Sequence, residues 1–265
     1  MILFPPAKIN LGLNVLFKRK DGYHEIESCM YQIPLYDILE IIKNDSFKFH
    51  QTGLKVNSEE EENLVVKAFR LIQAKFSIGN VYIHLFKSIP MGAGLGGGSS
   101  NAAYVIIGLN DLFNLNLSLK QMRSLAIELG SDCPFFIEKE PKIATGRGEI
   151  LKNVSIDLED KFLKIVNPII HLSTKDAYNG LNDFNNYSVE KVISQPVVKW
   201  KKQLKNSFES LVFKNYPEIE SIKNKLYMEG AIYASMSGSG STIYGIYNKE
   251  PKLTFDKKYE KIFRL

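Results

Sequence analysis

Residues 90–103 read PMGAGLGGGSSNAA and place five glycines within seven positions, from Gly92 to Gly98. The segment 81–86 before them predicts a strand, and the apolar stripe from Ala102 to Phe113 predicts a helix after them. Glycines allow positive φ angles and a close approach of the backbone to a ligand. Consecutive N–H groups at a helix N-terminus bind phosphate oxygens. The stretch therefore predicts a phosphate-binding loop rather than a loop that is merely flexible.

The sequence of this loop excludes several kinds of phosphate binder. It contains no G-K-S/T, so it is not of the Walker type. Gly92, Gly94 and Gly97 match the dinucleotide fingerprint by spacing, but that fingerprint needs a second strand ending in Asp or Glu about 20 residues further on. Here Asp111 falls within or at the end of the predicted helix, and a second helix is predicted at 119–129. The chain also lacks H-R-D, D-F-G and G-x-S-x-G, which excludes protein kinases and the simplest hydrolases.

The N-terminal region predicts strands and one helix. Strict alternation over residues 9–17 predicts a strand with one buried face. If this strand begins at Lys8, then Lys8, Asn10 and Asn14 share the opposite side. Residues 31–42 predict a strand with a turn near Pro34. A helix is predicted from Val65 to Phe76, because apolar residues recur there three and four positions apart.

The remaining elements indicate an α+β fold. The helix at 119–129 begins with a capping box, Ser118 with Gln121, and stops at Gly130. Residues 142–148 predict a turn at a domain edge. Further strands are predicted at 162–166, 232–234 and 242–247, and a helix at 219–227. We place a boundary near residue 150, which gives two lobes, 1–150 and 151–265.

Composition narrows the class of protein. With 265 residues, 45% of them hydrophobic and 24% charged, the chain has ordinary globular usage, which excludes wholesale disorder. Its net charge of +5 is thinly spread, so we expect no nucleic-acid partner. No apolar run approaches the roughly 20 residues that span a bilayer, and the start MILFPPAKIN has no secretory pattern, so we expect no membrane partner. Two cysteines, Cys29 and Cys133, suit a cytoplasmic protein. The four histidines have no zinc-binding spacing. Monomer and homodimer both stay open.

Three segments together resemble the motifs of the GHMP kinase superfamily of small-molecule kinases: PPAKINLGL at 5–13, PMGAGLGGGSSNAA at 90–103 and MSGSGS at 236–241. DGYHE at 21–25 and GSDCPFF at 130–136 are similar to the branch that acts on a diphosphocytidyl methylerythritol. The resemblance runs from about residue 5 to about residue 247. It departs from the branch at Cys133, where Val or Ile is usual, and in the polar stretch 181–207, which is hard to align.

The resemblance implies a two-lobed GHMP-kinase-like fold, with the active site in the cleft between an ATP-binding lobe, 1–150, and a substrate-binding lobe, 151–265. It implies ATP-dependent phosphorylation of the 2-hydroxyl of 4-diphosphocytidyl-2-C-methyl-D-erythritol, for isoprenoid precursor synthesis by the non-mevalonate route. One alternative is another GHMP enzyme, of the mevalonate or homoserine type, and DGYHE speaks against it. The other is a non-catalytic ligand sensor on the same scaffold. A sensor needs no base, whereas the resemblance gives this chain one.

The resemblance assigns the catalytic base to Asp132 and the neighbouring cation to Lys8. A lysine beside a carboxylate keeps it ionised and can stabilise charge on the transferring oxygens. Taken alone, Asp132 could be a turn or N-cap residue and Lys8 a solvated side chain. Mg²⁺ is expected to arrive with the ATP phosphates, with Ser99 or Ser100 in reach and no protein-built metal site. The residues expected to bind ATP are Pro90, Met91, Gly92, Ala93, Gly94, Leu95, Gly96, Gly97, Gly98, Ser99 and Ser100.

The acceptor is expected to contact Asn10, Tyr23, His24 and Tyr178. Tyr23 offers a face for stacking on cytosine, and His24 offers a donor and an acceptor for the base edge. Asn10 would hydrogen-bond the acceptor hydroxyl or the base. Packing in a hairpin turn is the alternative for Tyr23, and filling of the core is the alternative for Tyr178.

The loop 236–241 and the residues Lys87 and Asn63 each have two possible interpretations. The loop 236–241 lies near the substrate diphosphate in the superfamily, although its glycines also fit a plain hairpin turn. Lys87 and Asn63 either flank the adenine or lie on the surface.

Overall fold

The computed structural model describes residues 1–54, 60–181, 184, 187–256 and 259–265. The chain forms two compact units, each assembled from separate stretches. The first unit comprises Met1–Ala7, Pro34–Met91 and Gly96–Lys139. The second comprises Lys8–Ile33, Gly92–Leu95 and Glu140–Leu265. The compact units therefore do not follow a single division near residue 150.

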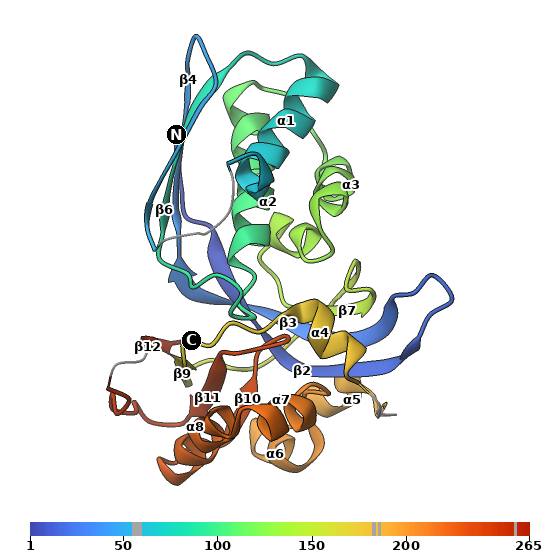
Figure 1. Ribbon diagram of the computed structural model, residues 1–265, viewed down its shortest axis with the longest axis vertical. Helices are drawn as coiled ribbons and strands as arrows, with labels where there is room; N and C mark the ends of the chain where they lie inside the picture. The colour runs from blue at the N-terminus through green and yellow to red at the C-terminus, as the bar shows by residue number, and fades with distance from the viewer. Residues whose placement is uncertain (55–59, 182–183, 185–186, 257–258) are drawn as a thin grey trace. The chain divides into compact units, whose positions relative to one another are not determined.

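The first unit is a four-stranded sheet with helices (Figure 1). Its strands are β1 (Ile2–Leu3), β4 (Ile38–Lys43), β6 (Val81–Lys87) and β5 (Lys48–Gly53), in that order. Its main helices are α1 (Leu64–Phe76), α2 (Gly97–Leu112) and α3 (Leu119–Leu129). The 3-10 helices η1 (Glu60–Glu62) and η2 (Cys133–Ile137) complete it. Helix α2 packs on β4, on α1 and on α3, so this glycine-led helix lies at the centre of the unit.

The helices of the first unit follow from their sequences. In α1 the apolar stripe is buried, and Asn63 caps the helix by accepting the Val65 N–H at 3.0 Å. The predicted capping box of α3 is confirmed, because Ser118 and Gln121 each accept the other's backbone N–H. Gly130 ends that helix, as expected.

The second unit contains two four-stranded sheets. One has the order β2 (Pro6–Lys18), β3 (His24–Tyr36), β7 (Lys142–Gly146) and β8 (Ile150–Asn153). The other has the order β10 (Tyr233–Met236), β11 (Ile243–Tyr247), β9 (Phe162–Asn167) and β12 (Tyr259–Arg264). Its helices are α4 (Thr174–Asn179), α5 (Val189–Ile193), α6 (Trp200–Gln203), α7 (Glu209–Asn215) and α8 (Pro217–Met228), with the 3-10 helix η3 (Val197–Lys199). The expected α+β class with two compact units is confirmed.

Four local expectations need correction. Strand β2 is buried on both faces up to Val15, because its polar side is paired within the protein instead of facing water. The second predicted strand continues through Pro34 and breaks at Asp37. Residues 142–146 form strand β7, which pairs with β3, so only the following residues make the predicted turn. Strand β12 was not predicted, since its charged sequence is typical of an exposed segment.

Candidate active site

The glycine-rich loop adopts the backbone conformation that its sequence predicts. Gly92, Gly94 and Gly96 have φ angles of 60°, 75° and 69°, a region that favours glycine. Gly96 is the N-cap of α2, so the helix begins at Gly97 with its first N–H groups unpaired by the helix itself. The loop therefore offers backbone donors at a positive helix end, which suits phosphate oxygens.

The two serines that follow the glycines differ in their partners. The Ser99 side chain hydrogen-bonds Cys133, whose thiol has its pKa raised to about 12 by burial, an effect that this bond partly opposes. The Ser100 hydroxyl is buried and has no hydrogen-bond partner among the described residues. A buried polar group without a partner is costly. Ser100 is thus suited to a ligand oxygen or a metal ion brought by a phosphate.

Lys8 lies on β2 and is only 3% exposed. Its Nζ donates to Asn10 Oδ1 at 2.5 Å, and its backbone N–H donates to Leu95 O at 2.9 Å. Asn10 Nδ2 in turn donates to Ser28 Oγ at 2.8 Å. The alternative that Lys8 is a solvated side chain is therefore wrong. Asn10 and Ser28 orient its ammonium, and the backbone bond joins β2 to the glycine loop.

The loop between β10 and β11 contacts the same part of the second unit. Ser237 Oγ accepts the Asn10 N–H at 3.2 Å and donates to Gly94 O at 2.8 Å. A Cβ on Gly94 would lie 1.9 Å from Ser237 O, so only glycine fits there. Residues 237–242 close a hairpin, as predicted, through the Ser237 N–H bond to Thr242 O at 2.9 Å. Ser237 thereby links the three segments that resemble the superfamily motifs: the first motif (5–13), the second (90–103) and the third (236–241).

Asp132 lies in the first unit, directly before η2. Its side chain makes no capping hydrogen bond to that 3-10 helix, although its backbone has helical angles. Asp132 therefore occupies the N-cap position of η2, as its alternative interpretation expects, but its side chain does not cap that 3-10 helix.

The three ring-bearing residues expected at the acceptor make two contacts, one of them with an arginine. His24 and Tyr178 are stacked, with ring centroids 5.0 Å apart and an angle of 25° between the planes. Tyr23 is 55% exposed, and the Arg147 guanidinium lies 4.7 Å from its ring centroid. Burial, followed by the nearby Lys18 charge, lowers the pKa of His24 below its usual value. At neutral pH the imidazole is therefore neutral and can both donate and accept.

Lys87, which was expected either to flank the adenine or to lie on the surface, does not lie on the surface. Lys87 is buried and forms an ion pair with Asp37, which also accepts the Asn101 side-chain amide at 2.9 Å. Burial lowers the pKa of Lys87, and the Asp37 charge opposes that effect. Asp37 further accepts the N–H groups of Ser88 and Ile89. The cluster holds β6 and the start of α2 together, and Asn63 is occupied as the cap of α1.

Sequence reasoning missed several residues of this arrangement. Ser28, Ser237 as an individual residue, and Arg147 were not singled out. Ser28 follows Ile26 at a period of two in β3, so a polar residue at an inward position was the available signal. Arg147 had no such signal, because its contact with Tyr23 depends on the pairing of β3 with β7.

The described residues lack a metal-binding cluster and a membrane-spanning helix. Within them, no cluster of three or more His, Cys, Asp or Glu side chains is arranged to hold a metal ion. None of the helices in the described ranges is both long and apolar enough to cross a membrane.

Comparisons with known proteins identify the family. Residues 63–139 match the GHMP kinases N terminal domain, and residues 191–256 match the GHMP kinases C terminal domain. A 4-diphosphocytidyl-2-C-methyl-D-erythritol kinase of Bacteroides fragilis is 48% identical over 96% of this chain and 94% of its own length. The kinase of that name from Caldanaerobacter subterraneus is 41% identical over 93% of this chain and 88% of its own.

A solved structure supports the same family. A crystal structure of a 4-(cytidine 5'-diphospho)-2C-methyl-D-erythritol kinase has a TM-score of 0.80 and 34% identity, covering 92% of this chain and 89% of its own. A Methanococcus jannaschii mevalonate kinase has a TM-score of 0.71 at 17% identity, covering 94% of this chain and 90% of its own, which shows a shared fold alone. The chain therefore belongs to the GHMP kinases, in the family of 4-diphosphocytidyl-2-C-methyl-D-erythritol kinases.

Proposed function

We propose that the protein transfers the γ-phosphoryl group of ATP to the 2-hydroxyl of 4-diphosphocytidyl-2-C-methyl-D-erythritol. The observation that carries this proposal is the similarity to kinases of that name over 96% of the chain. The mevalonate-type and homoserine-type alternatives rest on fold neighbours at 17% and 16% identity, which support no substrate. Residues 1–150 would hold ATP and, through Asn10, Tyr23 and His24, part of the acceptor, and residues 151–265 would supply the rest of the acceptor site.

The proposed mechanism assigns one task to each group. The loop 90–100 cradles the triphosphate with backbone N–H groups, which removes the need for a Walker lysine. Asp132, to which the family resemblance assigns the base, accepts the proton of the attacking hydroxyl. Lys8, held by Asn10, stabilises the negative charge on the transferring oxygens. Phosphoryl transfer of this kind depends mainly on positioning and electrostatics.

Magnesium would bind mainly through ATP. The Ser100 hydroxyl, buried and unpartnered among the described residues, fits a contact to a Mg²⁺–phosphate group. When bound, the ion would neutralise charge on the phosphate oxygens. Ser99 is the weaker candidate, because its hydroxyl already pairs with Cys133.

The acceptor would be recognised through its cytosine ring. Tyr23 would stack on one face, and its exposed ring, partly covered by Arg147, has room for a base. His24 would read the polar edge while held by its stack on Tyr178. Asn10 Oδ1 and Nδ2 already bond Lys8 and Ser28, so we assign Asn10 chiefly to orienting Lys8, with the acceptor hydroxyl as a second partner.

The direct test is a parallel assay of ADP release from purified protein with diphosphocytidyl-methylerythritol, mevalonate and homoserine. We expect turnover with the first substrate alone. Phosphorus NMR should then show a new phosphate monoester and an intact diphosphate bridge. Turnover with another acceptor, or a product without the monoester, would overturn the proposal. The absence of turnover with all three acceptors would favour the ligand-sensor alternative.

A further inference from the structure

A short segment of the second unit, Asn206–Glu209, connects strand β2 to the 236–241 hairpin. Asn206 lies between helix α6 and helix α7, and Glu209 is the first residue of α7. Leu13 forms a parallel bridge with Asn206, and the Leu13 N–H donates to Lys205 O at 3.0 Å. Because β2 also carries Lys8 and Asn10, this segment is anchored on the strand that holds the catalytic lysine.

The side-chain amide of Asn206 hydrogen-bonds the backbone of the hairpin. It is buried, and its Nδ2 donates to both Met236 O and Gly238 O at 2.8 Å. Its Oδ1 accepts the Phe208 N–H at 2.9 Å, which fixes the rotamer. The two carbonyls flank Ser237, so one side chain restrains the backbone on both sides of that serine. The Asn206 amide makes three hydrogen bonds without needing a water molecule.

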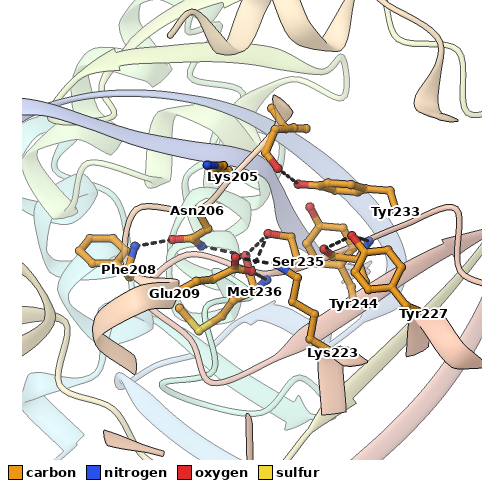
Figure 2. A network of polar contacts seen from close by, with 12 residues as sticks. Lys205, Asn206, Phe208, Glu209, Lys223, Tyr227, Tyr233, Ser235, Met236 and Tyr244 are labelled. Atoms are coloured by element: carbon orange, nitrogen blue, oxygen red, sulfur yellow. Dashed lines mark hydrogen bonds and ion pairs between the residues drawn. The ribbon is translucent and has the colours of Figure 1, made fainter. Parts of the chain in front are cut away.

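Glu209 holds the strand end that leads into the same hairpin. Figure 2 shows its carboxylate directed at the Ser235–Met236 backbone and at Lys223. Oε1 accepts the Met236 N–H at 2.8 Å and the Ser235 hydroxyl at 3.1 Å, and Oε2 accepts Lys223 Nζ at 2.7 Å. Burying a carboxylate is costly unless it is paired and hydrogen-bonded, and these contacts satisfy it. The Met236 peptide is thereby held at its N–H by Glu209 and at its carbonyl by Asn206.

The restrained serine is the one that joins the sequence motifs. Ser237 Oγ accepts the Asn10 N–H and donates to Gly94 O. A shift of the Ser237 backbone would therefore move the glycine loop at Gly94 and strand β2 at Asn10, next to Lys8. Tyr244 adds a third restraint, because its hydroxyl donates to Asn10 O at 2.8 Å. All of these contacts lie within the second unit.

We propose that Asn206 and Glu209 are positioning residues for phosphoryl transfer, which act by fixing Ser237 against Gly94 and Asn10. The inference rests on the proposed function. Neither residue touches a reacting atom. Their role is to hold the backbone of the third motif (236–241) where Ser237 can bond Asn10 of the first motif and Gly94 of the second. A residue that only stabilises the fold would affect unfolding and leave the turnover of the folded protein unchanged.

The test compares Asn206→Ala with Tyr227→Phe as a matched control. The Tyr227 hydroxyl donates to Ala234 O and accepts the Ala234 N–H, both at 3.1 Å, so this variant also loses contacts to the same strand, but before the hairpin. Both variants should melt earlier than the unaltered protein. Only Asn206→Ala should lower kcat, by roughly 10- to 100-fold, the scale expected when a catalytic group is misplaced by about 1 Å. The assay is run well below either melting temperature.

A second pair of variants decides the question if Asn206→Ala does not fold. Glu209→Gln keeps an oxygen that can accept the Met236 N–H, whereas Glu209→Met has similar length and no acceptor. We expect kcat close to that of the unaltered protein for Gln and a loss similar to that of Asn206→Ala for Met. Unchanged kcat in folded Asn206→Ala, or equal kcat for the Gln and Met variants, would overturn the inference. The assay of the unaltered protein with the three acceptors does not depend on the kcat of the variants relative to one another. If the unaltered protein fails to turn over diphosphocytidyl-methylerythritol, that result counts against the proposed function instead.

Discussion

Asp132 is the residue on which the proposed chemical step depends most directly. Asp132→Asn should lower kcat by roughly 100-fold or more, because an amide cannot accept the hydroxyl proton. ATP affinity should hardly change, since the loss belongs to the transition state. Steady-state kinetics and calorimetric titration of ATP into the folded variant give the two quantities.

Asp111→Asn is the control for this change, because Asp111 is an exposed aspartate at the end of α2. It should leave both quantities unaltered. An Asp132→Asn protein that is folded and nearly as active as the unaltered enzyme would remove Asp132 from the mechanism. A loose transition state needs little help from a base, and a defect much smaller than 100-fold would indicate that case.

Tyr23 tests the proposed contact with cytosine. Tyr23→Ala should weaken acceptor binding by roughly 1–3 kcal/mol, the range for loss of one stacked base. This corresponds to about 5- to 150-fold in Kd at 1.4 kcal/mol per tenfold. ATP affinity should stay the same, and calorimetric titration of each ligand measures the difference.

Tyr36→Ala provides the comparison, because Tyr36 is 45% exposed and belongs to the first unit. That variant should bind the acceptor normally. If Tyr23 only packs in its hairpin, Tyr23→Ala will melt earlier and lose affinity for both ligands equally. Loss of the Arg147 contact is a further change in Tyr23→Ala, so Arg147→Met separates the two effects.

The proposed contact of His24 with the acceptor predicts a pH dependence of binding with a defined sign. Burial lowers its pKa, so the imidazole is neutral at pH 7 and loses its acceptor atom only as the pH falls through a value below about 6.5. The acceptor Kd should therefore rise on acidification, by at most about tenfold per pH unit for one proton. His24→Gln, which does not titrate in this range, should lack that component. A slope that is the same in both proteins would assign it to the ligands.

Only the parts of the candidate site that lie within sequence motifs were predictable from the sequence. The positive φ angles of the glycine loop follow from residue type, and so does the position of Asp132 after the Gly130 stop. The stack of His24 on Tyr178 depends on contacts across 154 residues of chain, which no local pattern encodes. The same holds for the bonds from Asn206 and Glu209 to the hairpin.

At the scale of elements, the glycine loop and the β10–β11 hairpin fit together through Gly94. Gly94→Ala would combine a side chain at φ 75° with a Cβ 1.9 Å from Ser237 O, a backbone atom that cannot move without the hairpin. We expect a large loss of turnover and of ATP affinity, together with a lower melting temperature. Melting curves and ATP titration measure these effects.

Gly79→Ala is the matched control. Gly79 has no positive φ, and its Cβ would meet only Phe113 Cε1, at the ordinary distance of 3.8 Å. This variant should keep full activity and could gain stability, because alanine reduces the freedom of the unfolded chain. Full turnover by Gly94→Ala would show that the hairpin need not sit against the loop.

Elements with strong local signals were predicted well, and elements that depend on tertiary pairing were not. Helix α3 carries its own start and stop, so its ends were fixed by Ser118 and Gly130. Strand β2 alternates in sequence, yet its polar side is buried by Ser28 and by the 236–241 hairpin, which are far away in sequence. Strand β12 forms because β9 offers an edge, and its own sequence gave little indication of it.

At the scale of the whole molecule, the two compact units interleave along the chain. The second unit takes Lys8–Ile33 from the N-terminal region, and the first ends at Lys139. The buried cluster of the second unit includes Leu13, Val15 and Ile26 beside residues from 166 onwards. A division near residue 150 would therefore separate side chains that pack in one core.

This arrangement predicts the behaviour of a fragment that begins at residue 151. It keeps every strand of the β10–β11–β9–β12 sheet but loses Leu13, Val15 and Ile26 from its core. At roughly 1.5–3 kcal/mol for each buried apolar side chain, the three contribute about 4.5–9 kcal/mol. That is comparable to the about 5–15 kcal/mol that stabilises a whole domain. We expect the fragment 151–265 to lack a cooperative thermal transition and protected amides, measured by circular dichroism and hydrogen exchange, whereas the full chain has both. Adding the fragment 1–150 should restore protection in β9 and β11, because it supplies strand β2. A fragment 151–265 that melts sharply by itself would show that the boundary near residue 150 divides the protein into independent domains after all.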